Sequence, residues 1–64
     1  MNYKYYKVKE VAEFLSIAKS KVYELIYTGD IGFLKIGGTY RISDHHLENY
    51  IKKNSYRAKP KKPF

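Results

Sequence analysis

The stretch VKEVAEFLSIAKSKVYELI, from Val8 to Ile26, decides the fold that the sequence predicts. In each half, apolar residues recur three and four positions apart, which is the spacing of one face of a helix. Gly29 follows the second half, and glycine is the residue most often found just past a helix end. The apolar positions are Val8, Val11, Ala12 and Leu15 in the first predicted helix, and Val22, Leu25 and Ile26 in the second.

Only Ser16, Ile17 and Ala18 link the two predicted helices. So short a link makes the helices cross steeply and share one core, which is the geometry of a helix-turn-helix. The packing positions also fit, because Ala12 is small, Ser16 stands at the turn where glycine is usual, and Val22 follows the alanine by ten positions. The alternative is an ordinary αα-hairpin without a ligand. The DNA-binding spacing in a basic chain favours the helix-turn-helix.

Residues 33–42, FLKIGGTYRI, change to a strand pattern and predict a β-hairpin. A two-residue loop at Gly37 and Gly38 would mix apolar and charged side chains on one face. We therefore predict a three-residue loop, 37–39, which pairs Lys35 with Arg41 on the outside. Paired like charges repel each other unless an anion lies over them, so this hairpin favours anion contact over a plain solvent-facing hairpin. The side chains predicted to face the core are Leu34, Ile36, Tyr40 and Ile42.

The remaining elements complete an α+β fold. Ser43 is predicted to cap a third helix with Asp44 in its first turn, where a carboxylate is favourable. The apolar stripe of this helix is predicted to be Leu47, Tyr50 and Ile51. The start YKYY, residues 3–6, is predicted to add a short strand beside the hairpin. The sequence thus predicts one small winged helix-turn-helix domain over residues 1–53, with a two-stranded wing.

The positive charge is concentrated at the C-terminal end. Residues 1–51 hold seven Lys or Arg and six acids, whereas residues 52–64 hold six Lys or Arg and no acid. With two prolines and little apolar surface to bury, residues 54–64 are predicted to form a disordered basic arm. Contact with a polyanion is favoured over a merely solubilising tail. The cations of this end are Lys52, Lys53, Arg57, Lys59, Lys61 and Lys62.

Several classes of function are disfavoured. The chain has no cysteine for a disulfide or a thiolate zinc site, and no apolar run of about 18 residues for a membrane span. His45 and His46 are neighbours that point in different directions on a helix, so no metal site is predicted. No catalytic constellation is present, and we predict neither an enzyme nor a cofactor. The eight tyrosines could stack on single-stranded nucleic acid, but most lie on predicted core faces.

Residues 5–52 resemble the excisionase-type winged helix-turn-helix domains of phages and integrative elements, which are related to MerR-type regulators. The stretches VKEVAEFLSI, SKVYELIYTGDI and KIGGTYRIS carry the resemblance. It implies that the second helix enters the major groove and that the wing touches the adjacent backbone or minor groove. The implied DNA contacts are Lys19, Ser20, Lys21, Tyr23 and Glu24 on the helix and Lys35, Thr39 and Arg41 on the wing. Lys19 and Lys21 could contact phosphates or a guanine edge.

The sequence departs from the family pattern at three positions. Lys7 stands where Thr or Ser usually precedes the first helix, and Ala18 where Ser usually starts the second. Each missing cap costs about 1 kcal/mol. Glu24 stands where a basic residue is common, and its carboxylate is unfavourable near DNA unless it accepts from a cytosine or pairs with Lys21.

The favoured function is an excisionase, or recombination directionality factor, acting on DNA in the bacterial cytoplasm. It would bind double-stranded element-end DNA, associate cooperatively with other copies there, and assist an integrase (a tyrosine recombinase) through the C-terminal arm. A minimal phage or mobile-element transcriptional regulator of the same fold is the alternative. MerR-type regulators carry a long dimerising helix and an effector domain that these 64 residues lack, which favours the excisionase. An RNA-binding or protein-interaction module that uses the arm is a third class.

Overall fold

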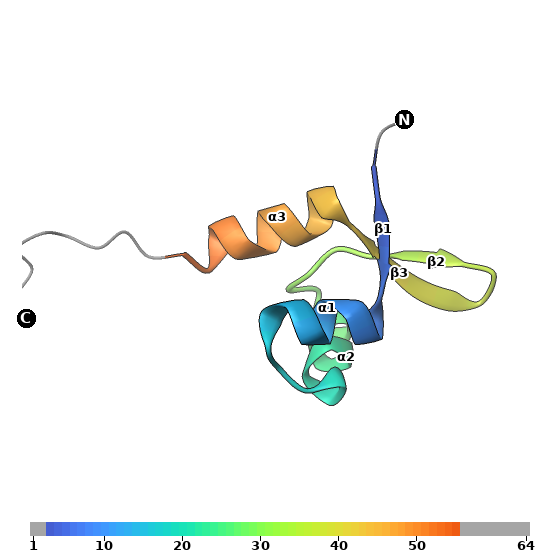
Figure 1. Ribbon diagram of the computed structural model, residues 1–64, viewed down its shortest axis with the longest axis horizontal. Coiled ribbons are helices and arrows are strands. Elements are labelled where there is room, and N and C mark those ends of the chain that lie inside the picture. Colours follow the sequence, from blue (N-terminus) through green and yellow to red (C-terminus); the bar gives the residue numbers. More distant parts are fainter. Residues whose placement is uncertain (1–2, 56–64) are drawn as a thin grey trace, which may run out of the picture.

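The computed structural model describes residues 3–55 as three helices and one three-stranded antiparallel sheet (Figure 1). The strand order is β1-β3-β2, with the hairpin of β2 and β3 projecting on one side and α3 leaving on the other. This architecture confirms the predicted winged helix-turn-helix. The elements are β1 (Tyr5–Lys7), α1 (Val8–Leu15), α2 (Lys19–Thr28), β2 (Leu34–Ile36), β3 (Thr39–Ser43) and α3 (Asp44–Lys53).

Left-handed residues end both helices of the helix-turn-helix. Ser16 follows α1 with a φ of 59°, and the N–H of Ile17 then donates to the carbonyl of Ala12 at 2.9 Å. Gly29 follows α2 with a φ of 81°, and Asp30 N–H donates to Leu25 at 2.9 Å. Each turn thus satisfies helix carbonyls that would otherwise lack a partner. The conformation is natural for Gly29 but unfavourable for Ser16, because its Cβ crowds the following carbonyl.

Replacing Ser16 with glycine is therefore expected to stabilise the domain by about 0.5–1 kcal/mol, after allowance for the greater freedom of glycine in the unfolded chain. Ser20→Gly is the matched control, since Ser20 lies within α2 and the same substitution there should destabilise by a similar amount. Urea denaturation followed by far-UV circular dichroism measures both changes. A Ser16→Gly variant less stable than the parent would contradict the strain argument.

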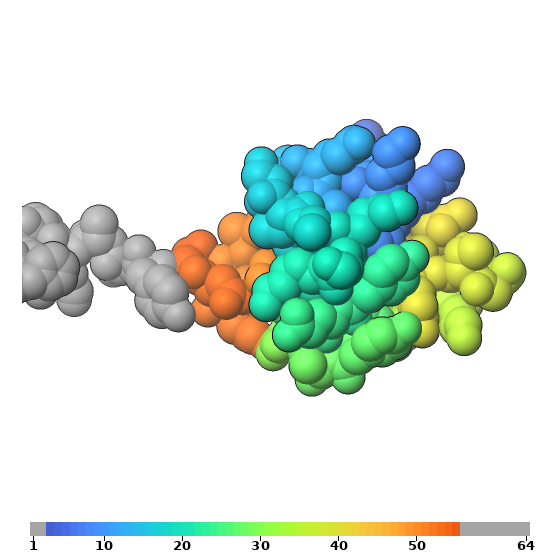
Figure 2. Space-filling model, turned by 90° about the horizontal axis from the view of Figure 1, so that it is seen from below, coloured from blue at the N-terminus to red at the C-terminus, as the bar shows by residue number. Residues whose placement is uncertain are grey.

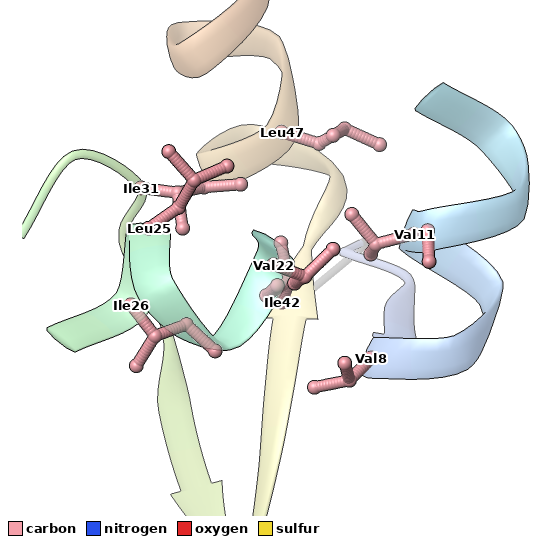
Figure 3. Close-up of a cluster of buried hydrophobic side chains, with 9 residues drawn as sticks. Val8, Val11, Val22, Leu25, Ile26, Ile31, Ile42 and Leu47 are labelled. Atoms are coloured by element: carbon pink, nitrogen blue, oxygen red, sulfur yellow. The ribbon is translucent and has the colours of Figure 1, made fainter. Parts of the chain in front are cut away.

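All three helices and the sheet share one hydrophobic core (Figure 3). Most residues of the helix faces predicted from periodicity are buried there, whereas Leu15 and Tyr50 are half-buried against the core and Ile51 remains 38% exposed. Ile31, in the loop between α2 and β2, is 1% exposed although no periodicity marks it. The core therefore includes a loop residue that the pattern did not predict. Its members are Val8, Val11, Ala12, Val22, Leu25, Ile26, Ile31, Ile42 and Leu47.

The predicted three-residue hairpin loop is wrong. Ile36 pairs with Thr39 and Leu34 with Arg41, so the loop contains only Gly37 and Gly38. Both glycines have positive φ, 61° and 84°. Two successive positive φ values match the right-handed twist of the strands, and glycine adopts them without steric cost. The backbone conformation of the two glycines therefore sets the register, although this register places apolar and charged side chains on the same face of the hairpin.

The shorter loop changes which side chains share a face of the wing. Lys35 pairs with Tyr40, and its Nζ lies 5.5 Å from the centroid of the tyrosine ring. Arg41 points to the other face, so the predicted Lys35–Arg41 pair does not form. Ile36 is 51% exposed and Leu34 is half-buried, which corrects their assignment to the core. The face that they share with Arg41 is only partly covered by the rest of the domain.

The third helix begins as predicted. Ser43 Oγ accepts the backbone N–H of His46 at 3.1 Å, and Ser43 N–H is directed at Nδ1 of His46 at 3.4 Å. The His46 ring also lies against Gly32, where a Cβ would stand 2.5 Å from the ring. His46 is therefore half-buried, and its ring supports the start of α3. The predicted cap at Ser43 and the acidic first-turn residue Asp44 are confirmed.

Only the first two residues of the predicted basic arm lie within the described part of the chain. Asn54 Nδ2 donates to the Tyr50 carbonyl at 2.9 Å, and Ser55 Oγ donates to the Ile51 carbonyl at 2.6 Å. These bonds cap the end of α3. The arm from residue 56 onward lies outside the described residues. Among residues 3–55, no helix is long and apolar enough to cross a membrane.

Candidate nucleic-acid interface

A basic groove of about 460 Å³ lies between the start of α1, the start of α2 and the wing. Figure 2 shows this face, with α2 in the centre, the start of α1 (blue) above it and the wing (yellow) to one side. Four of the lining residues are cationic and none is acidic, which concentrates positive potential in the groove. The basic groove is lined by Lys7, Val8, Lys9, Lys19, Tyr23, Gly38, Thr39, Tyr40 and Arg41.

Aromatic contacts fix the wing against α2 beside the groove. The rings of Tyr23 and Tyr40 meet edge to face with their centroids 6.1 Å apart, and Phe33 meets Tyr40 at 5.3 Å. Such edge-to-face pairs favour a defined mutual orientation. Tyr23 therefore packs against the wing while remaining 37% exposed, whereas Tyr27 is 72% exposed. Helix α2 and the wing are thus held at a defined angle.

The guanidinium of Arg41 is held in the groove by its own strand. Its Nη1 donates to Thr39 Oγ1 at 2.9 Å and to the Tyr40 carbonyl at 3.0 Å. Thr39 Oγ1 in turn donates to the Ile36 carbonyl at 3.0 Å. A guanidinium has five N–H donors, so others remain for an anion. Because the side chain is already ordered, less conformational entropy is lost when a ligand binds.

The first turn of α2 presents Lys19, Ser20 and Lys21 to solvent. Ala18 offers no side-chain cap, and the free N–H groups of a helix start favour a phosphate. Lys21 Nζ lies 3.5 Å from Glu24 Oε1. The sequence predicted that the Glu24 carboxylate is unfavourable near DNA unless it pairs with Lys21 or accepts from a cytosine. The structure contains the pair with Lys21. Because both side chains are largely exposed, the pair contributes little to stability.

The structure brings together only some of the predicted residues and adds two others. Lys19, Tyr23, Thr39 and Arg41 line the basic groove, whereas Lys35, which shares a face of the wing with Tyr40, is not among the lining residues. Lys52 and Lys53 lie in the last turn of α3, which extends away from the wing (Figure 1). Lys53 Nζ is 3.8 Å from Asp30 Oδ1 and ties α3 to the loop after α2.

Sequence reasoning missed Lys7 and Lys9. Both line the basic groove, because β1 pairs with β3 in a register that sets Lys7 opposite Arg41. The sequence predicted a strand at the start but gave no register for it. Lys9 lies off the apolar positions of the first predicted helix, and the sequence alone does not connect it with the wing. The clustering of these lysines with the wing is therefore a tertiary feature.

Residues 3–55 contain no group of three His, Cys, Asp or Glu side chains that could hold a metal ion. The rings of His45 and His46 are 6.3 Å apart and tilted by 52°. A smaller apolar groove of about 260 Å³ lies elsewhere and is lined by Tyr6, Glu10, Val11, Phe14 and Leu47.

The sequence model of the helix-turn-helix domain matches residues 5–55, from β1 through the end of α3. The chain belongs to the helix-turn-helix domain family. Domains of this family bind DNA, and their second helix lies in the major groove. In this helix-turn-helix domain the second helix is α2, and its first turn borders the basic groove. No curated protein and no solved structure matches the chain significantly.

Proposed function

We propose that this helix-turn-helix domain is an excisionase-type architectural factor, which binds double-stranded element-end DNA sequence-specifically and assists an integrase in excision. The observation that carries the DNA-binding part is the acid-free basic groove between α2 and the wing. The exposed side of α2 supports it, because Lys19, Ser20, Tyr23, Glu24 and Tyr27 follow helical spacing along one face. With this face turned toward the DNA, α2 fits into the major groove, which is about 12 Å wide.

The roles within the interface follow from the chemistry of the side chains. Lys19 and Lys21 contact phosphates or a guanine edge from the first turn of α2, and Ser20 contacts the backbone beside them. Tyr23 and Glu24 face the bases one turn later. Arg41 and Thr39 reach the adjacent backbone or minor groove from the wing. Lys35, on the wing face that it shares with Tyr40, contacts the flanking backbone.

The excisionase role rests on the resemblance of three sequence stretches and on the basic C-terminal end. Lys52 and Lys53 stand where α3 leaves the domain, on the side away from the wing (Figure 1). The basic residues at this end of the chain are proposed to contact an integrase or flanking DNA. Cooperative self-association on neighbouring sites belongs to the same proposal.

A salt titration of binding tests the DNA-binding part. Fluorescence anisotropy with a labelled duplex should give dissociation constants from about nanomolar to micromolar, which rise steeply between 50 and 200 mM salt because phosphate contacts dominate. Matched single-stranded DNA and RNA should bind more weakly. Affinity that is independent of salt would refute the proposal. Stimulation of integrase-dependent excision from a reconstituted element tests the finer role.

Lys19→Ala is expected to raise the dissociation constant for duplex DNA about five- to twentyfold, since a phosphate or base contact is lost. Its melting temperature should be unchanged, because Lys19 is exposed and outside the core. Lys4→Ala controls for loss of one charge away from the groove, and Val22→Ala for loss of a core residue. If Lys19→Ala destabilised the domain as much as Val22→Ala, Lys19 would be structural.

A further inference from the structure

Lys7 violates three local rules of stability at one position. It is the N-cap residue of α1, with φ −78° and ψ 160°, and its ammonium cannot accept the N–H bond that a cap normally provides. Its positive charge lies at the positive end of the helix dipole. It also pairs directly with Arg41 across β1 and β3, and like charges at paired positions repel each other.

The fold does not use the Lys7 side chain to compensate for these costs. The start of α1 is held by Glu10, whose Oε1 accepts the backbone N–H of Lys7 at 2.9 Å. That bond involves the backbone of Lys7 and leaves its ammonium free. Among residues 3–55, the ion pairs are Lys21–Glu24 and Lys53–Asp30, so neither Lys7 nor Arg41 is neutralised by a described carboxylate.

Both side chains of this like-charge pair line the basic groove, with Lys9 beside them. Arg41 is already oriented by Thr39 and by the Tyr40 carbonyl. An anion between Lys7 and Arg41 would convert their repulsion into two attractions. Violations of local rules that concentrate at one exposed residue are typical of functional positions. The bound chemistry that fits is a singly charged phosphodiester approached from two sides.

We propose that Lys7 and Arg41 jointly bind one phosphate of the DNA backbone, and that Lys7 occupies the N-cap at the expense of the stability of the free domain. This inference rests on the proposed DNA-binding function. It adds β1 and the start of α1 to the interface, as a second contact beside the recognition helix. It also predicts opposite effects on stability and on binding from a single substitution.

Lys7→Ser in the full chain tests the proposal. Serine supplies the missing cap and removes the repulsion, so the melting temperature without DNA should rise by about 5 °C. The dissociation constant for duplex DNA should rise about fivefold, and the slope of log affinity against log salt should fall by about 0.9. Lys4→Ser is the matched control, since Lys4 is exposed and outside the groove, and should change neither quantity appreciably.

A duplex in which single phosphates are replaced by neutral methylphosphonates locates the contact. One position should weaken binding by the parent chain and have a smaller effect on Lys7→Ser and on Arg41→Gln. A lower melting temperature for Lys7→Ser, or unchanged affinity while Lys19→Ala binds weakly, would overturn the joint phosphate site and leave the proposed function intact. If the parent chain itself failed to bind duplex DNA, the proposed function would fall first.

Discussion

Ile42→Ala is expected to leave a large fraction of the molecules unfolded at room temperature. Ile42 is 0% exposed and lies in β3, the central strand, which pairs with both β1 and β2. Truncation of a buried isoleucine to alanine costs about 2–5 kcal/mol, depending on how far the surroundings relax. Typical stabilities per residue imply about 3–10 kcal/mol for a domain of this size. The single cavity would therefore remove much or all of the folding free energy.

Ile36→Ala is the matched control and also tests the hairpin register. Ile36 is 51% exposed in the observed register, so its truncation should cost less than about 1 kcal/mol. In the three-residue-loop register, both isoleucines would face the core and their truncations would cost similar amounts. Urea denaturation of the two variants, followed by far-UV circular dichroism, measures the difference. Comparable losses would contradict the two-residue loop.

Truncation after Ser55 is expected to produce the largest change in DNA binding. It removes Arg57, Lys59, Lys61 and Lys62, and each cation that neutralises a phosphate contributes about 0.9 to the salt slope of a duplex. The slope should flatten by about two to four, with a corresponding loss of affinity at low salt. Stability should change little, because the capping bonds of Asn54 and Ser55 remain. Anisotropy titrations and thermal melts give both quantities.

The same truncation separates the excisionase from the regulator. If the arm contacts an integrase, its loss should abolish cooperative assembly on element-end DNA at every protein concentration. A regulator that uses the arm only for charge should recover full activity when more protein is added. Replacing the four cations with glutamine, in a chain of full length, is the control for charge alone. A truncated domain that unfolds would show that Tyr56 or Phe64 packs on the core.

The sequence by itself determined the helices and their buried faces. The spacing of Val8, Val11 and Ala12 and of Val22 and Leu25 follows from the period of the α-helix, which is a local property of the backbone. Gly29 and Ser43 likewise act within one turn of their own helix, as a left-handed stop and as a side-chain cap. The short link then left little choice in how the two helices pack. The predictions of these features were correct because their physical causes lie within a few residues of each other in the sequence.

The tertiary structure decided the strand pairings and therefore the composition of the basic groove. The loop prediction failed because it assumed one fully buried face, whereas the wing is covered only where Tyr40 meets α2 and Phe33. The pairing of Lys7 with Arg41 was beyond local reasoning, since 34 positions separate them and only the shared sheet sets their register. The burial of Ile31 was likewise beyond local reasoning, because it lies in a loop and only the packing of the surrounding elements buries it. Periodicity determines which face of an element is apolar, but only packing determines which charges meet across elements.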